Sequence, residues 1–162
     1  MPREIEKKYL VRGEPWTGLD GKCLRQAYLS TEGKATVRVR ICGELAWLTI
    51  KGRPAEGSFD RLECEYPVPA DEAGKIDGVA DFINNAGTGE LIEHFAGFEW
   101  VIDVFKGDNE GLVLAEIELP SEDTSFDLPP WAGQDVTFDH RFSNSALSKS
   151  PWKNFREEFL RG

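Results

Sequence analysis

The chain has 162 residues, of which 40% are hydrophobic and 30% charged, and its formal net charge is −10. This length suits one domain with its own core, so we expect a single domain over residues 1–162. An acidic surface repels nucleic-acid phosphates, so the composition argues against a nucleic-acid partner. A polyanion would bind only where basic residues gather or metal ions intervene.

Nothing in the sequence predicts a membrane segment or a secretion signal. No stretch approaches the roughly 20 consecutive apolar residues of a membrane-spanning helix, and the opening MPREIEKKYL is too polar for a signal peptide. The three cysteines, Cys23, Cys42 and Cys64, are odd in number and are not spaced as a metal site. We therefore expect small buried thiols in a reduced, cytoplasmic protein with no membrane partner.

Alternation of polar and apolar residues with a period of two dominates the chain and predicts strands. Gly33, Gly43 and the stretches GRP (52–54) and KGD (106–108) separate these strands as turns. The region from Tyr28 to Gly52 has the pattern of consecutive antiparallel hairpins. The expected strands cover residues 3–11, 23–31, 34–42, 45–52, 58–67, 90–95, 98–106 and 112–119.

Helices are expected in few places. Residues 70–87 fit one helix, because apolar residues recur at helical spacing from Ile76 to Ile83. A second, weaker helix is expected after Asp123, and the tail predicts two short helical pieces broken at Pro151. Many strands with few helices indicate a mainly β fold of the α+β type, built as a closed or nearly closed antiparallel barrel.

Like charges are stacked on one face of several expected strands. Side chains two residues apart in a strand share a face, so the EIEKK stretch places two glutamates and a lysine together. The same arrangement recurs on other strands, three times as Glu-x-Glu. The sets are Glu4, Glu6 and Lys8; Arg38 and Arg40; Trp47, Thr49 and Lys51; Arg61, Glu63 and Glu65; and Glu116 and Glu118.

Two interpretations of these faces compete. A solvated face explains any single strand, but solvated faces usually intersperse signs, and each stacked like pair costs a few tenths of a kcal/mol even in water. Turned inward, about six carboxylates would face about five cations, and a dry core cannot hold unpaired charge. The set therefore predicts a wet tunnel whose bases contact a polyanion and whose carboxylates hold a divalent cation such as Mg²⁺.

These segments resemble the CYTH family, also called triphosphate tunnel metalloenzymes, in its compact bacterial form. The family hallmark is an N-terminal Glu-x-Glu-x-Lys, here Glu4 to Lys8. The likeness continues in family order through LRQAYLS, VRVR, LTIKG, RLECEY, WVIDVFKG, LVLAEIELP and VTFDHRFSNSAL. The resemblance implies an eight-stranded antiparallel β-barrel that forms a polar tunnel, with a few helices packed outside. It also implies an enzyme that hydrolyses a small polyanionic triphosphate compound with Mg²⁺ or Mn²⁺, inorganic tripolyphosphate being favoured.

The resemblance also implies roles for individual residues. Lys8 and Tyr28 are the catalytic candidates, with Tyr28 near Lys8 to orient it or the attacking water. Asp103 is a further carboxylate or a hydrogen-bonding residue at a strand end, and Arg141 is a further cation near the tunnel end, beside capping residues Asp135 and Asp139. The expected phosphate ligands are Lys8, Arg38, Arg40, Lys51 and Arg61, and the expected metal ligands are Glu4, Glu6, Glu63, Glu65, Glu116 and Glu118.

One departure from the family pattern leaves the function open to alternatives. The family usually carries a Lys-x-Arg pair in the strand before Asp103, but no Lys or Arg lies between Lys75 and Lys106, where His94 is the only candidate cation. The alternatives are a non-catalytic or altered-specificity binder of nucleotide or polyphosphate, and an ATP-cyclising enzyme. In the tail, exposed Trp152 and Phe155 would either close one mouth of the barrel or mark a homodimer contact.

Overall fold

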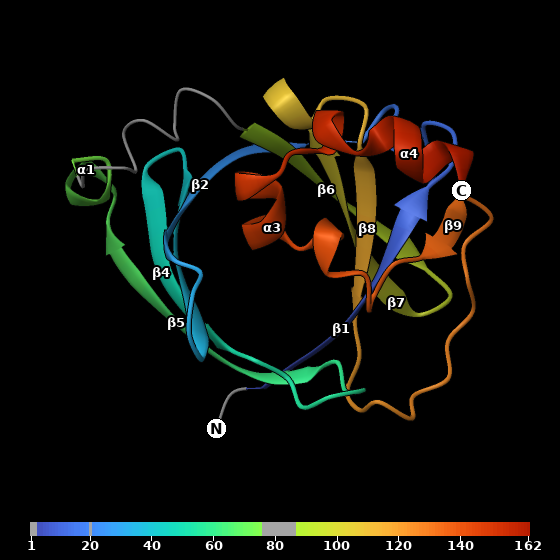
Figure 1. Ribbon diagram of the computed structural model, residues 1–162, viewed down its shortest axis with the longest axis horizontal. Coiled ribbons are helices and arrows are strands. Elements are labelled where there is room, and N and C mark those ends of the chain that lie inside the picture. Colours follow the sequence, from blue (N-terminus) through green and yellow to red (C-terminus); the bar gives the residue numbers. More distant parts are fainter. Residues whose placement is uncertain (1–2, 20, 76–86) are drawn as a thin grey trace.

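Antiparallel strands make up most of the computed structural model, which describes residues 3–19, 21–75 and 87–162 (Figure 1). The strands are β1 (Arg3–Val11), β2 (Lys22–Ser30), β3 (Ala35–Cys42), β4 (Leu45–Gly52), β5 (Asp60–Pro69), β6 (Gly87–Phe95), β7 (Phe98–Phe105), β8 (Val113–Glu118) and β9 (Ala132–Asp135). The helices are α1 (Ala70–Ala73), α3 (Asn144–Lys149) and α4 (Arg156–Arg161), with the 3₁₀ turns η1 (Gly107–Asn109), η2 (His140–Phe142) and η3 (Trp152–Asn154). The eight expected strands are therefore present.

The strands curl into a barrel because β1 pairs with strands from both ends of the sheet. The order is β5-β4-β3-β2-β6-β7-β8-β1-β9, with an additional pairing of β5 with β1. Residues Arg3 to Ile5 of β1 pair with β5, whereas residues Glu6 to Leu10 pair with β8. The two ends of the sheet therefore meet only along the start of β1. Beyond that point the sheet is not closed, and the gap between β1 and β5 forms a seam.

The main apolar core lies on the outer face of β1, β7 and β8. Trp100, Ile102, Ala115 and Ile117 are fully buried there, and Phe126 and Trp131 pack against them from the long connection that follows β8. Trp100 makes edge-to-face contacts with both of these rings, at centroid distances of 6.0 and 5.5 Å. Because the apolar positions of these strands face outward, the alternate positions face the barrel interior.

Trp152 is buried and Phe155 is partly buried, which corrects the expectation that both are exposed. Trp152 is only 6% exposed and packs with Phe142 and Phe155 in a second apolar cluster. Contacts among these rings hold the tail against the β7–β8 turn, where Asn109 accepts a hydrogen bond from the Trp152 backbone amide at 2.8 Å. Trp152 is therefore not available as a free surface patch.

Three other expectations about local structure need comment. The helix expected after Asp123 is absent from the described residues, because that segment runs in an irregular conformation that places Phe126 and Trp131 on the outer core. Only α1 is described of the helix expected over residues 70–87, since residues 76–86 lie outside the described part of the chain. The two helical pieces of the tail are confirmed, and β9 is an additional strand that pairs with β1.

The thiols and the helices are placed differently from the simplest expectation. Cys42 and Cys64 are free but only half-buried, so they are not core residues.

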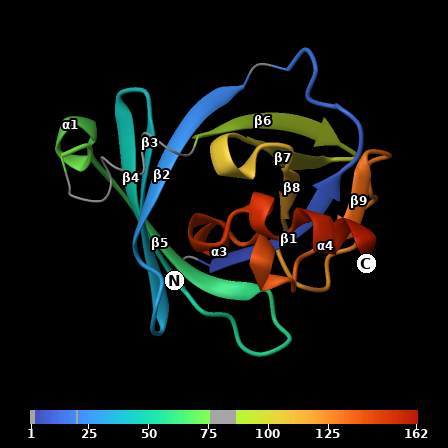
Figure 2. The same cartoon turned by 45° about the horizontal axis from the view of Figure 1, so that its top comes forward.

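α1 packs outside the barrel against β3, β4 and β5, whereas α3 lies within the ring of strands in the views of both Figure 1 and Figure 2. No helix in the described ranges combines the length and apolar character that crossing a bilayer requires.

We predict that Trp100→Ala will lower the free energy of unfolding by about 3–5 kcal/mol, because it opens a cavity among Tyr9, Phe126 and Trp131. Urea titration followed by circular dichroism measures this change. Leu160→Ala, at a position 73% exposed, is the matched control and should change stability by less than about 0.5 kcal/mol. A similar loss in both variants would show that the outer face of β7 is not the main core.

Candidate active site

Charged side chains fill the interior of the barrel around a cavity of about 260 Å³. Among the described residues that line it, seven are acidic and five are basic. Every charged residue predicted to bind phosphate or metal is in this lining: Glu4, Glu6, Lys8, Arg38, Arg40, Lys51, Arg61, Glu63, Glu65, Glu116 and Glu118. The inward set expected from alternation therefore shares one enclosed space.

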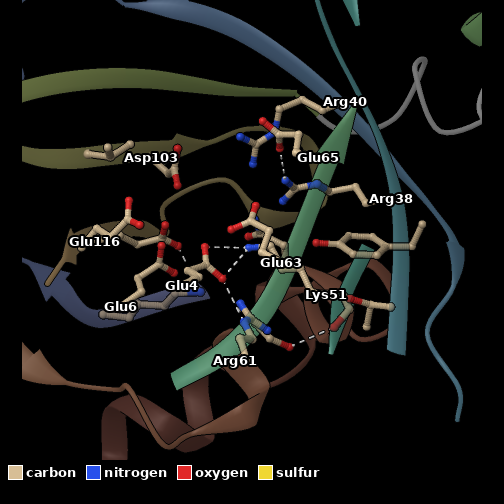
Figure 3. A pocket seen from close by; sticks show the side chains of 18 residues that line it. Glu4, Glu6, Arg38, Arg40, Lys51, Arg61, Glu63, Glu65, Asp103 and Glu116 are labelled. Carbon is tan, nitrogen blue, oxygen red and sulfur yellow. Dashed lines mark hydrogen bonds and ion pairs between the residues drawn. The ribbon is translucent and has the colours of Figure 1, made fainter. Parts of the chain in front are cut away.

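The two signs of charge are unevenly distributed around the cavity. Figure 3 shows Glu6, Asp103 and Glu116 on one side and Arg38 and Arg40, with Glu65 beside them, on the other. The side that comes from β1, β7 and β8 is mostly acidic, and the side that comes from β3, β4 and β5 carries most of the bases. We call these the acidic wall and the basic wall. A multiply charged anion can approach the basic wall while cations are held near the acidic wall, which suits a metal-bound polyphosphate.

Glu4, on β1, is held by two bases: Lys51 near the end of β4 and Arg61 near the start of β5 (Figure 3). Lys51 donates to both carboxylate oxygens, at 2.9 and 3.0 Å, and the Arg61 Nε donates to Oε2 at 2.9 Å. The Glu4 residue is only 7% exposed. Burial alone would raise the pKa of this carboxyl, but the charges of Lys51 and Arg61 outweigh it and hold the pKa at about 2. Glu4 is therefore an anion whose acceptor oxygens are already occupied by bases.

Lys8 and two glutamates form a second charged group, across the β1–β8 ladder. Lys8 is opposite Glu116 in the register, and its Nζ lies 3.2 Å from the Glu116 carboxylate and donates to the Phe142 carbonyl at 3.1 Å. Glu6 is opposite Glu118. Burial raises the pKa of Glu6 well above its ordinary value, and the nearby charges of Glu116 and Glu4 raise it further. Two carboxylates directly across a ladder repel each other unless a cation lies between them.

The Glu116 carboxyl responds in the opposite direction to that of Glu6. Burial would raise the pKa of Glu116, but the charges of Lys8 and Lys51 outweigh it and lower the pKa. The Lys8 pKa is raised, since the negative charges of Glu116 and Glu6 outweigh the effect of burial. The pair Lys8 and Glu116 is therefore charged on both members, and Glu6 is the carboxyl of this group that favours a proton.

Thr49 connects the basic wall to Glu65, a role that the sequence analysis did not assign. Its hydroxyl donates to the Glu65 carboxylate at 2.8 Å and accepts from the Arg38 guanidinium at 3.3 Å. Thr49 is 1% exposed, and Arg38 is 5% exposed. The period-two alternation had already placed Thr49 on the inward face with Lys51. A hydroxyl is uncharged, however, so this position alone did not indicate a functional role.

The C-terminal segment completes the lining at one end of the barrel. Ser143, Asn144 and Ser145, at the start of α3, contribute to the cavity. The Ser143 side chain caps α3 by accepting from the Ala146 amide at 3.1 Å. The sequence analysis assigned no site residue here, because a serine-rich helix start is ordinarily read as a cap. The tail thus lies at one mouth of the tunnel, although its aromatic residues are packed away from it.

A second hollow of about 240 Å³ adjoins the cavity along the seam between β1 and β5. It shares Glu6, Lys8, Arg61 and Ser143 with the cavity, and its other described lining includes the exposed ring of Phe138. The seam is where the β1–β5 ladder ends after Ile5. The interior therefore has a lateral opening in addition to the ends of the barrel.

Tyr28 and Asp103 both line the cavity, as predicted. Tyr28 lines the cavity from β2, opposite Arg38 in the register, whereas the contacts found for Lys8 are with Glu116 and Phe142. The catalytic role of Tyr28 remains a prediction. Asp103 is 7% exposed and lines the acidic wall, which favours its interpretation as a site carboxylate.

Arg141 was expected as a further cation near the tunnel end, and this role stays a prediction. Its guanidinium pairs with Asp139 at 2.7 Å and lies over the rings of Phe155 and Phe159. It is not among the described residues that line the cavity. The assignments of the neighbouring acids are confirmed: Asp139 accepts from the Arg141 amide at the start of η2, and Asp135 accepts from the Thr137 amide.

The wall formed by β6 and β7 offers little positive charge. The residues that the described part of these strands contributes to the cavity are Val101 and Asp103. His94 is opposite Glu99 in the ladder, further along the strands, and does not belong to the described lining. The departure from the family pattern at this strand therefore leaves this side of the tunnel apolar and acidic.

Carboxylate oxygens are the hard ligands that Mg²⁺ and similar cations prefer, so the acidic wall fits a divalent metal by its donor chemistry. Glu6, Glu116 and Glu118 supply carboxylates to this wall from the neighbouring strands β1 and β8. However, within the described ranges, no three carboxylate, histidine or cysteine side chains come close enough together to hold a metal ion. The protein side chains alone therefore do not form a complete coordination shell in this arrangement.

Comparison with known proteins agrees with the fold. A protein of Acetivibrio thermocellus named inorganic triphosphatase is 42% identical over 161 residues, which cover 97% of this chain and 100% of the relative. An inorganic triphosphatase of Nitrosomonas europaea is 34% identical over 159 residues, covering 91% of this chain and 97% of the relative. The crystal structure of the inorganic triphosphatase NE1496 matches with a TM-score of 0.63 and 30% identity, covering 91% of this chain and 95% of that one.

The family model named CYTH domain matches residues 2–151, which include all the charged residues of both walls. With most of its length matched by that model, and with relatives of 42% and 34% identity covered almost from end to end, this chain belongs to the CYTH domain family.

Proposed function

We propose that this chain is a metal-dependent hydrolase of inorganic tripolyphosphate that releases a terminal phosphate. The observation that carries the proposal is the enclosed cavity with a basic wall facing an acidic wall. The names of the two relatives, both inorganic triphosphatases, support the same substrate. A small anion of high charge also suits a tunnel in which most lining side chains are ionisable.

The basic wall matches the substrate in charge and in shape. Arg38, Arg40 and Arg61 carry planar guanidinium groups that bind phosphate oxygens through two parallel hydrogen bonds, and Lys8 and Lys51 act as compact point charges. Because the cavity is partly shielded from water, each contact is electrostatically stronger than at the surface. These five side chains would bind the non-bridging oxygens along a chain of phosphoryl groups.

The acidic wall supplies the residues for a divalent cation, which membership of this family implies. Glu6, Glu116 and Glu118 would hold it, and we propose Mg²⁺ or Mn²⁺ because both prefer oxygen ligands. When bound, such an ion polarises phosphoryl oxygens and makes a coordinated water more acidic. Burial and the neighbouring carboxylates raise the pKa of Glu6, so a cation bound there would compete with a proton.

The side chains then divide the work of hydrolysis. A water molecule attacks the terminal phosphorus in line with the bond to the leaving pyrophosphate, which breaks as the new P–O bond forms. Lys51 and Arg61 neutralise charge on the phosphoryl oxygens, and a carboxylate of the acidic wall accepts the proton of the water. Lys8, fixed by Glu116 and by the Phe142 carbonyl, keeps a positive charge at the floor of the cavity.

We predict phosphate release from tripolyphosphate that requires Mg²⁺ or Mn²⁺. Chelation with EDTA should abolish the release, and adding back either ion should restore it, because without a cation the carboxylates would repel the substrate. A colorimetric phosphate assay on tripolyphosphate, ATP and thiamine triphosphate measures this. Formation of cyclic AMP and pyrophosphate from ATP would instead identify a cyclising enzyme, and binding without turnover would identify a non-catalytic binder.

Replacing the opposed carboxylates Glu6 and Glu118 by glutamine should lower kcat/KM for tripolyphosphate by about 100-fold or more, because two oxygen ligands of the acidic wall are lost. The double variant Glu44→Gln with Glu56→Gln removes the same charge from exposed turns and should retain full activity. Thermal unfolding of both proteins checks that the fold survives. Retained turnover in the first variant would refute the assignment of the acidic wall.

Thr49 is a positioning residue, and Thr49→Val should lower kcat/KM by about 10-fold because Glu65 and Arg38 lose their shared hydroxyl. Thr49→Ser keeps the hydroxyl and should restore most of the activity. We expect the change mainly in KM, since Arg38 is a substrate ligand. Equal losses in the valine and serine variants would show that packing, not the hydroxyl, matters at this position.

A further inference from the structure

Within the tunnel, the predicted phosphate ligands form ion pairs with the predicted metal ligands. Lys51 and Arg61 contact Glu4 at 2.9 Å. Lys8 lies 3.2 Å from Glu116, and Arg38 lies 3.8 Å from Glu65. At least four of the five basic side chains assigned to the substrate are thus paired with a carboxylate assigned to the metal. The two sets of ligands therefore compete with each other for partners.

Glu4 is the most constrained of these carboxylates. Both of its oxygens accept hydrogen bonds from Lys51 or Arg61, and its side chain is 9% exposed. A cation that takes Glu4 must displace these bases, which leaves two enclosed positive charges without a partner. A phosphate that takes Lys51 and Arg61 leaves an enclosed carboxylate without a partner. Either exchange alone is unfavourable. Removing one member of an enclosed ion pair leaves the other charge buried without a partner, and the desolvation free energy of that charge is then not offset.

Both exchanges together keep every charge paired. Phosphoryl oxygens would then accept from Lys51 and Arg61, and Glu4 would be released to ligate a cation. The metal geometry agrees with this: within the part of the chain that the structure describes, no three potential ligand side chains come close enough together to hold a metal without further oxygen donors. Phosphate oxygens are the usual source of those donors for Mg²⁺.

We propose that the Glu4–Lys51–Arg61 group couples the two ligands, so that the tunnel binds divalent cation and triphosphate as a unit and binds each one weakly alone. The inference rests on the proposed function and adds to it the form in which the substrate is accepted. Coupling between ligands is reciprocal, and a typical coupling changes affinity about 5- to 150-fold. Breaking the group on its basic side should therefore have opposite effects on the two ligands.

The test is isothermal titration calorimetry on the full chain with two probes: Mg²⁺ alone, and imidotriphosphate, a triphosphate analogue with nitrogen bridges, alone. Lys51→Met should tighten Mg²⁺ binding by about 5-fold or more, because one competitor for Glu4 is gone, while it weakens binding of the analogue. Arg61→Gln provides the same test if the first variant does not fold. Arg40→Gln is the matched control, since Arg40 also lines the cavity but is not among the groups that hydrogen-bond Glu4.

The acidic side of the group gives the complementary test. Glu4→Gln should tighten binding of imidotriphosphate without Mg²⁺, because Lys51 and Arg61 are released to it, and should reduce the gain in affinity that added Mg²⁺ gives. Glu63→Gln, which removes one charge from the same cavity, is the control and should give a smaller effect in the metal-free titration. Thermal unfolding of each variant accompanies the titrations.

The outcomes separate the coupling from the function. Weaker or unchanged Mg²⁺ binding in Lys51→Met, or an equal gain in Arg40→Gln, would overturn the coupling even if the wild type hydrolyses tripolyphosphate. Opposite shifts for the two probes would support the coupling even if turnover of tripolyphosphate were absent. Both proposals would be overturned if the wild type bound neither the analogue nor Mg²⁺ alone and showed no binding when the two were added together.

Discussion

Pairing of opposite charges inside the barrel is the interaction on which the rest of this structure depends. The interior holds seven acids and five bases among the described lining residues, and an enclosed charge is stable only when it has a partner. The strands meet this requirement by bringing acids and bases together, both on the same side of the cavity, as in Lys8 with Glu116 and Arg38 with Glu65, and across it. Glu4 links the two sides through Lys51 and Arg61, so it has a structural part as well as a proposed part in binding.

Keeping the interior polar requires the apolar core to lie elsewhere. Trp100, Ile102 and Ile117 are buried on the outer face of the sheet, under a connection that carries Phe126 and Trp131. That connection has no helix among its described residues, yet it covers the core because its aromatic side chains are large. The barrel is thus stabilised from outside, which leaves its interior free to be shaped by charge. The seam between β1 and β5 is a consequence, because no apolar packing within the barrel draws these strands together beyond Ile5.

The same arrangement explains how the chain can differ from its family in one strand and still keep the site. The β6–β7 side contributes Val101 and Asp103 to the described lining, so the basic residues are concentrated on β3, β4 and β5, with Lys8 on β1. A tunnel with bases on one side only would orient an anion against that side. The opposite side is then left mostly to carboxylates, which we propose as the ligands of a divalent cation. With most bases on one side of the tunnel, a short linear anion can be bound along that side. An anion that needs basic residues all around it would fit less well.

Local pattern was sufficient to predict which side chains face the interior, because side-chain direction in a strand depends only on the period-two alternation. Glu4, Glu6 and Lys8 could therefore be assigned together, and the ladders then brought Glu116 opposite Lys8. Where the pattern was weak, the prediction was wrong. The helix expected after Asp123 gave way to packing of Phe126 on the outer core.

The sequence by itself determined the strands, the inward face and the list of ionisable groups, since these follow from neighbours along the chain. Only the tertiary structure decided which groups are partners. Glu4 meets Lys51 and Arg61, which are 47 and 57 residues away, and Thr49 meets Glu65 across the β4–β5 ladder. The burial of Trp152 and the place of Ser143 at the cavity were also decided at this level. Such contacts depend on how the sheet curls and where its ends meet, and no local spacing records that curvature.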